Sequence, residues 1–136
     1  MDNAPIICAD VIARHGDSFV LIQRKTNPIG LALPGGKHDP GETLSETAIR
    51  ELYEETQLEL TIQHTMGVYA HQGRDPRGNY ISVVFIGVAV GTPKPETCKT
   101  EVLLLSQDEI ILRSSELVFD HSQILTDYLK GDCDGN

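Results

Sequence analysis

The stretch that decides the fold covers residues 36–55 and reads Gly36-Lys-His-Asp-Pro-Gly-Glu42-Thr-Leu-Ser-Glu-Thr-Ala-Ile-Arg50-Glu51-Leu-Tyr-Glu54-Glu55. A loop rich in Gly and Pro leads directly into a segment with helical periodicity. A helix places Glu51, Glu54 and Glu55 on one face, where neighbouring like charges repel by a few tenths of a kcal/mol per pair. Hard divalent cations such as Mg²⁺ and Mn²⁺ select oxygen-rich sites of this kind. The pattern therefore predicts a metal site, and the alternative is a solvated acidic face.

Local signals place the start of this helix. Thr43, followed three residues later by Glu46, forms a capping box, which predicts a helix that begins near Thr43. Glu46 and Arg50 form an i, i+4 pair in the favourable order. The apolar stripe that would bury one face of the helix consists of Leu44, Ala48, Leu52 and Tyr53.

The spacing of these residues resembles the Nudix box. The residues that carry the resemblance are Gly36, Glu42, Arg50-Glu51-Leu52, Glu54-Glu55 and Leu58. A chance match at six of these positions is expected in roughly one chain of this length in 10⁵. The family usually has glycine two residues after the last glutamate, where this chain has Gln57. If the helix ends there in a left-handed residue, the side chain costs about 1–2 kcal/mol, and otherwise the helix continues for another turn.

The order of the expected elements indicates an α+β fold, and the resemblance sharpens this to the Nudix fold, a mixed sheet between helices. One domain would cover residues 1–136, a length that suits a single core. The expected strands are 6–14, 18–24, 58–72, 80–90 and 101–105. The expected helices start near Thr43 and cover 115–130, while 26–33 is a loop and 106–109 a short turn or helix start.

The resemblance implies hydrolysis of a phosphoric anhydride with Mg²⁺ as cofactor, for which Mn²⁺ substitutes. Such a reaction requires an activated water, neutralised phosphoryl charge and alignment of both. The expected ligands are Glu51, Glu54, Glu55 and the backbone carbonyl of Gly36. Glu51 is also a candidate general base, and Glu54 is grouped with it as catalytic.

Other residues have less direct roles in this scheme. Arg50 is counted with the catalytic residues, where it holds the carboxylates in place. Glu42 contributes to the metal site or fixes the loop. In some branches of the family the base lies on a later loop, and Glu96 and Glu101 are the candidates for that position here. Both are also candidate metal ligands.

A second set of segments resembles the subgroup of ADP-ribose pyrophosphatases. These segments are Arg74-Asp75-Pro76-Arg77-Gly78, Val83-Val84-Phe85 and Phe119-Asp120-His121. Two loop arginines, Arg74 and Arg77, can clamp a diphosphate bidentately, although the same residues also make a good charged turn. Arg24, Tyr80 and Phe85 are further candidates for substrate binding. For His121, the simpler interpretation is a half-buried helix histidine with one hydrogen bond.

Three functions compete for this sequence. The leading one is hydrolysis of a nucleoside diphosphate linked to another group, with ADP-ribose giving AMP and ribose 5-phosphate. The first alternative is a nucleoside triphosphate pyrophosphohydrolase that removes damaged nucleotides, with which Leu33-Pro-Gly-Gly-Lys37 is compatible. The second is a non-catalytic ADP-ribose sensor. Some relatives join this domain to a DNA-binding one, but the chain ends at Asn136 and its box carboxylates are intact, which favours an enzyme.

Composition excludes several partners. The net charge of −9 argues against nucleic acid or an anionic membrane surface as a partner, because phosphates select Lys and Arg. The three cysteines, Cys8, Cys98 and Cys133, have the spacing of neither a disulfide framework nor a zinc site. With no secretory signal or apolar run of spanning length, the expected location is the cytoplasm. The resemblance alone implies a homodimer.

Overall fold

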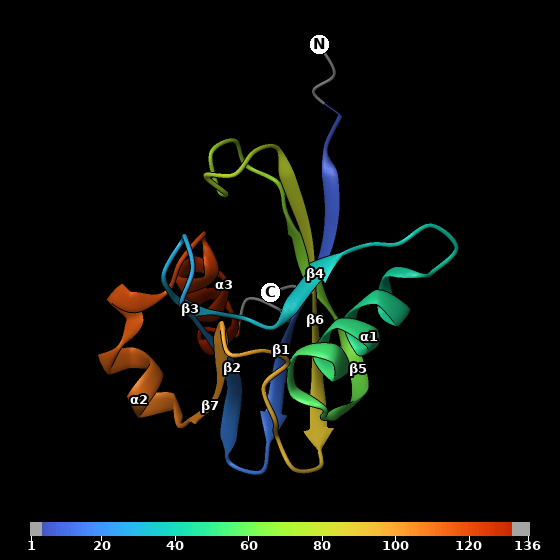
Figure 1. Cartoon of the computed structure of the whole chain (residues 1–136). Coiled ribbons are helices and arrows are strands. Elements are labelled where there is room, and N and C mark those ends of the chain that lie inside the picture. Colours follow the sequence, from blue (N-terminus) through green and yellow to red (C-terminus); the bar gives the residue numbers. More distant parts are fainter. Residues whose placement is uncertain (1–3, 132–136) are drawn as a thin grey trace.

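The computed structural model describes residues 4–131 and shows a mixed sheet with helices on both sides (Figure 1). The strands are β1 (Ile6–His15), β2 (Ser18–Arg24), β3 (Gly30–Ala32), β4 (Gly35–Lys37), β5 (Glu59–Tyr69), β6 (Tyr80–Val90) and β7 (Thr100–Leu105). The helices are α1 (Leu44–Thr56), α2 (Gln107–Leu112), α3 (His121–Leu129) and the short 3-10 helix η1 (Ser114–Glu116).

The sheet opens between β1 and β2. These strands pair antiparallel only beside their hairpin, at Arg14 with Phe19 and at His15 with Ser18. Farther along, β4 pairs with β1, whereas β3 and β7 pair with β2. On its other side β1 runs parallel to β6, which is followed by β5 at the edge. The two central strands therefore diverge and leave room for a pocket.

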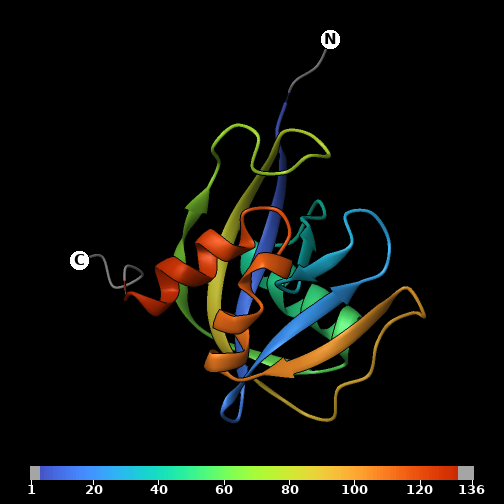
Figure 2. The same cartoon turned by 90° about the vertical axis from the view of Figure 1, so that its left-hand side faces the viewer.

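Alternation along β1 produces two apolar cores, one on each face of the sheet. Val11 packs in the cluster that contains Leu52 of α1. Its neighbour Ile12 packs in the cluster that contains Ile110 of α2 and Ile124 of α3. Figure 2 shows α3 lying across the sheet on the side away from α1. This confirms the α+β fold with a mixed sheet between helices.

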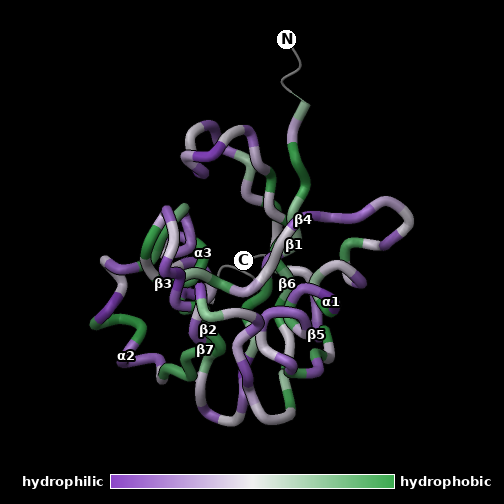
Figure 3. Tube along the Cα trace, viewed as in Figure 1, coloured by the Kyte–Doolittle hydropathy of each residue, from purple (hydrophilic) through white to green (hydrophobic). Residues whose placement is uncertain are grey.

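Hydrophilic residues are concentrated in two loops outside the layered core. In Figure 3 hydrophilic residues gather on the loop between β5 and β6 and on the loop that leads into α1. Within residues 4–131 no helix has both the length and the apolarity needed to cross a membrane.

Most of the expected elements are present. The capping box of Thr43 and Glu46 starts α1, and a second one, Ser106 with Glu109, turns the expected helix start at 106–109 into α2. The loop expected at 26–33 was wrong in part, because it contains β3. The short strand β4 was also missed. Both strands are three residues long and acquire their partners only from β1 and β2.

The helix expected at 115–130 is shorter than its apolar spacing suggested. Leu117 bridges Leu31 of β3, and the Val118 N–H donates to the Leu31 carbonyl at 2.8 Å. Phe119 then takes a left-handed conformation with φ 58°. Pairing with the sheet therefore removes the first residues of the expected helix, and α3 begins at His121.

Gln57 ends α1 in the left-handed conformation. Its φ is 62° and its ψ is 15°, and its N–H donates to the Tyr53 carbonyl at 2.7 Å. The helix therefore stops at Thr56 and does not run on for another turn.

We predict that Gln57→Gly stabilises the protein by about 0.5–1 kcal/mol, because glycine relieves the left-handed strain but costs more chain entropy. The thermal midpoint should rise by about 2–4 °C. Gln57→Ala is the control and should give no gain, since alanine keeps the Cβ. An equal or lower stability of the glycine variant, measured by thermal or urea unfolding, would contradict this account of the helix end.

Candidate active site

A pocket lies where β1 and β2 diverge, next to β4 and to the N-terminal end of α3. Its walls come from segments that are distant in the sequence. The lining residues are Cys8, Asp10, Ile22, Arg24, Ala32, Leu33, Gly35, Gly36, Lys37, Glu55, Arg74, Asp75, Arg77, Tyr80, Thr100, Phe119 and His121. Gly36 and Glu55 of the box thus share one pocket with Arg24, Arg74, Arg77 and Tyr80 from the expected substrate-binding set.

Gly36 of β4 lets the acidic face of α1 approach the sheet, and Gly35 lets β4 approach β1. A Cβ on Gly36 would lie 1.9 Å from Glu51 Oε2, and one on Gly35 would lie 2.1 Å from Asp10 Oδ1. The Gly35 N–H donates to Glu55 Oε1 at 2.9 Å. Gly35 also has φ 155°, which L residues rarely adopt. A side chain at Gly36 would therefore push Glu51 away from the strand, and one at Gly35 would collide with Ala9 and Asp10 of β1.

Burial makes these carboxylates hard to ionise. It raises the pKa of Glu51 from 4.5 to about 7, with Glu54 and Glu96 adding repulsion and Arg50 opposing it. Burial also raises the pKa of Glu55 well above its ordinary value, against the favourable Gly35 N–H, and the Glu51 charge adds to the rise. A bound cation would offset both effects, because it favours the charged form of each carboxyl.

The donors on α1 suit a hard divalent cation in their chemistry. They are carboxylate oxygens that stand beside a glycine backbone. The charge of Glu54 raises the pKa of Glu51, and the charge of Glu51 raises the pKa of Glu55, as expected where positive charge is lacking. Within the described part of the chain, however, no three His, Cys, Asp or Glu side chains already converge in the arrangement of a metal centre. The expected ligands are therefore gathered on one surface without forming a closed cage.

Arg50 braces the loop between β4 and α1. Its Nε donates to Glu42 Oε2 at 2.7 Å and its Nη2 to the Lys37 carbonyl at 3.0 Å, while Nη1 donates to Glu54 Oε1 at 3.1 Å. The hydrogen bond from Arg50 is the main reason that the pKa of Glu42 falls to about 2. Arg50 is thus a positioning residue, and Glu42 fixes the loop.

The two later glutamates lie in different places. Glu96 is exposed on the loop between β6 and β7, and its charge contributes to the raised pKa of Glu51 and Glu55. Glu101 of β7 instead forms an ion pair with Lys25 at 3.5 Å. Its neighbour Thr100 lines the pocket, so strand alternation points Glu101 to the other face. The expectation for Glu101 is therefore corrected, and Glu96 remains a candidate.

Arg74 does not have the free guanidinium that a diphosphate clamp needs. Its Nε donates to Asp120 Oδ2 at 2.9 Å, its Nη2 to Asp120 Oδ1 at 2.5 Å, and its Nη1 to the Tyr80 carbonyl at 3.4 Å. Both members of this ion pair are buried. Arg74 therefore fixes the loop between β5 and β6 to the start of α3, which corrects the clamp expectation.

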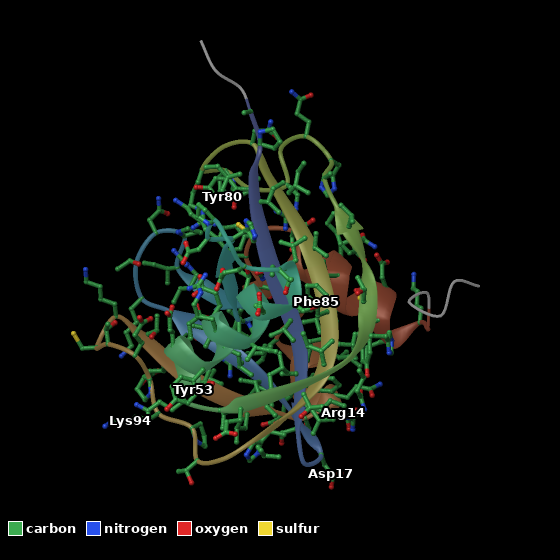
Figure 4. All side chains as sticks on the ribbon, turned by 90° about the vertical axis from the view of Figure 1, so that its right-hand side faces the viewer. Arg14, Asp17, Tyr53, Tyr80, Phe85 and Lys94 are labelled. Carbon is green, nitrogen blue, oxygen red and sulfur yellow. The ribbon has the colours of Figure 1, made fainter. Side chains whose placement is uncertain are left out.

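Of the remaining candidates for substrate binding, two line the pocket and one is buried in the core. Arg24 lines the pocket and donates from Nε to the Pro28 carbonyl at 2.8 Å, which braces the loop before β3. Tyr80 also lines the pocket. Phe85 is 4% exposed and packs with the core under α1. Figure 4 shows Phe85 in the middle of the sheet and Tyr80 near its end. The expectation for Phe85 is thus wrong, because that side chain belongs to the core.

Sequence reasoning missed Asp10, whose signal is a lone carboxylate inside an apolar strand. Asp10 accepts a hydrogen bond from Ser82 Oγ and lies 3.8 Å from His121 Nε2. His121 Nδ1 accepts the Leu33 N–H at 2.9 Å, and burial lowers the pKa of this histidine. A neutral ring with its proton on Nε2 fits both neighbours. The single hydrogen bond expected for His121 is thus present, and it ties α3 to the loop before the box. The side chain is buried, however, and not half-buried as expected.

Phe119 was also missed as a pocket residue. Its left-handed backbone costs about 1–2 kcal/mol for a residue with a side chain. The flanking segments hold it there, through the Val118 N–H to Leu31 and through the Asp120 ion pair with Arg74. The sequence gives no signal for this, because glycine and asparagine are the residues that usually mark such a turn.

The comparisons with known proteins agree with this geometry. A family model described as NUDIX domain matches residues 4–128. Since the match covers most of the 136 residues, the chain belongs to the Nudix family. The chain is 37% identical over 129 residues to the ADP-ribose pyrophosphatase of Methanocaldococcus jannaschii. The alignment covers 93% of this chain and 74% of that relative.

The matches to two further relatives cover a smaller share of the relative's own chain. A putative 8-oxo-dGTP diphosphatase of Bacillus subtilis is 37% identical over 59 residues, or 43% of this chain and 39% of that protein. A bifunctional NMN adenylyltransferase/ADP ribose pyrophosphatase of Francisella tularensis, solved with AMP and a manganese ion, superposes with TM-score 0.84 at 28% identity. That match covers 97% of this chain, which spans less than half of the Francisella chain (43%).

We predict that the metal-free protein loses stability as pH rises. The folded pKa of Glu51, about 7, exceeds its unfolded value of 4.5, so its stabilising contribution is complete below pH 4.5 and is lost as pH rises through about 7. The lowered pKa of His121 acts in the opposite direction below its unfolded value of 6.5, so thermal midpoints in EDTA should fall mainly between pH 6.5 and pH 8.

Glu51→Gln should flatten part of this decline and raise the midpoint at pH 8, because the amide never ionises. Glu59→Gln, an exposed glutamate of β5, is the matched control and should keep the wild-type slope. A decline as steep in Glu51→Gln as in the wild type would show that burial of Glu51 has little electrostatic cost.

Proposed function

We propose that this Nudix hydrolase cleaves ADP-ribose to AMP and ribose 5-phosphate with the help of a divalent cation. The observation that carries the proposal is the acidic face of α1, whose Glu51 and Glu55 have raised pKa values beside the glycines of β4. The pocket beside it is lined by Arg24 and Lys37, which suit a phosphate-bearing substrate. The similarity to the Methanocaldococcus jannaschii enzyme supports ADP-ribose.

The proposed ligands of the cation are Glu51, Glu54, Glu55 and the Gly36 carbonyl. The cation, Mg²⁺ with Mn²⁺ as a substitute, supplies charge neutralisation and lowers the pKa of a bound water. Glu51 or Glu96 accepts the proton of the attacking water, and Arg50 keeps the carboxylates and the preceding loop aligned. Manganese in the Francisella tularensis relative supports a divalent cation of this type.

One alternative substrate has a specific observation in its favour. The partial match to a putative 8-oxo-dGTP diphosphatase of Bacillus subtilis supports a nucleoside triphosphate. It covers less than half of this chain, whereas the match to the ADP-ribose pyrophosphatase covers 93% of it. ADP-ribose therefore has the stronger support. A sensor, in contrast, would bind ADP-ribose without metal-dependent turnover.

The same proposal includes the cellular location, the oligomeric state and the partners of the protein. A cytoplasmic location agrees with Cys8 and Cys98, which are free thiols in the described part of the chain. Cys133 lies outside the described residues. A homodimer is implied by the family resemblance, and the substrate requires neither nucleic acid nor a membrane.

We predict that Glu54→Gln and Glu55→Gln each lower the rate of ADP-ribose hydrolysis by about 10²–10⁴-fold at saturating Mg²⁺, because each amide removes an anionic metal ligand. Both variants should remain folded, since the amide is nearly isosteric with the acid. Glu59→Gln serves as the control and should turn over like the wild type. Wild-type rates in Glu54→Gln or Glu55→Gln would remove the metal-site assignment.

A substrate panel tests the choice of nucleotide. We expect ADP-ribose to be cleaved faster than NADH, diadenosine polyphosphates or 8-oxo-dGTP. Product analysis in ¹⁸O-labelled water should find the label in AMP or in ribose 5-phosphate, which identifies the attacked phosphorus. Turnover of 8-oxo-dGTP while ADP-ribose remains intact would replace the proposed substrate with the triphosphate.

A further inference from the structure

The guanidinium of Arg77 contacts two aromatic rings of the pocket. Its Cζ is 4.8 Å from the centroid of the Tyr80 ring and 4.6 Å from that of the Phe119 ring. Both distances fall within the roughly 6 Å range of cation–π contacts. Its Nε and Nη2 also donate to the buried Asp75 carboxylate, at 3.0 and 2.8 Å. The charge of Arg77 is therefore already balanced inside the protein.

The strained backbone of Phe119 indicates that its aromatic ring has a functional role in the pocket. A glycine at φ 58° would make the same turn without strain. The structure instead keeps a bulky aromatic residue in this conformation, where its ring contacts Arg77, Arg24 and His121. Tyr80 supplies the second ring, from the first residue of β6.

We propose that Phe119 and Tyr80 form the base-stacking slot for the nucleotide and that Arg77 occupies this slot in the ligand-free protein. A purine and a guanidinium are both flat and both bind the faces of aromatic rings, so they compete for the same space. A base that enters must displace Arg77, which is then a plug on the substrate site.

The charges around the slot fit a nucleotide better than a free base. Lys37 Nζ lies 6.0 Å from the Tyr80 ring, and Arg24 Cζ lies 5.5 Å from the Phe119 ring. The same pocket extends to Glu55 of the box. A base held against these rings in place of Arg77 therefore leaves its phosphates among cationic side chains and next to the acidic face of α1.

Adenosine is the probe for this slot, because it carries the base without a phosphate and so does not report on a diphosphate clamp. Its dissociation constant is measured by NMR titration with the full-length protein. Arg77→Ala should bind adenosine about three- to tenfold more tightly than the wild type, since the plug is gone. Adding Phe119→Gly to that variant should abolish the gain.

Two controls keep the test decisive. Arg113→Ala removes a similar arginine–carboxylate pair, with Glu116, that does not line the pocket, and should leave adenosine binding unchanged. If Arg77→Ala does not fold because Asp75 loses its partner, Asp75→Asn/Arg77→Ala removes both charges and carries the same expectation.

Unchanged or weaker adenosine binding by the plug-free variant would overturn the proposal, and so would a gain that persists without the Phe119 ring. The slot rests on the proposed nucleotide substrate, so ADP-ribose turnover by the wild type is measured alongside. Tighter adenosine binding without ADP-ribose hydrolysis would keep the slot and reject that substrate. Hydrolysis with unchanged adenosine binding would keep the substrate and reject the slot.

Discussion

The close packing of α1 carboxylates against two glycines of β4 is the constraint on which the rest of the structure depends. A Cβ at Gly36 would collide with Glu51, and the Gly35 N–H holds Glu55. This contact buries anionic groups and raises their pKa values, which is unfavourable for the empty protein. Arg50 offsets part of this cost from outside the site. A bound cation would stabilise such a face. The burial that raises the carboxyl pKa values would therefore also favour metal binding.

The second requirement is a pocket beside that face, and the divergence of β1 and β2 provides it. Buried polar contacts fix its far wall. His121 accepts the Leu33 N–H, and Asp120 holds Arg74. Buried ion pairs add little to stability but favour one arrangement over others. Here they set the position of α3 relative to the box, and they place Phe119 at the pocket.

The parts of this account that could be predicted from the sequence are local. Three features depend only on spacing within about one helix, where side-chain positions follow from the helical period. They are the Nudix box, the capping box at Thr43 and the left-handed helix end at Gln57. The role of Arg74 could not be predicted, because its partner Asp120 is 46 residues away. Phe85 was misassigned because the sequence does not show which face of β6 meets α1. The strands β3 and β4 are too short to have a periodic signal.

The most direct test of the central claim is calorimetric titration of Mn²⁺ into the wild-type protein near pH 6.5, in two buffers of different ionisation enthalpy. Because Glu51, with a pKa of about 7, is largely protonated at that pH, binding should occur with measurable proton release, and Glu51→Gln should reduce both the affinity and the proton release. Binding without proton release would contradict the account of a buried carboxyl that must ionise to hold the metal. The absence of any uptake would contradict the metal site itself.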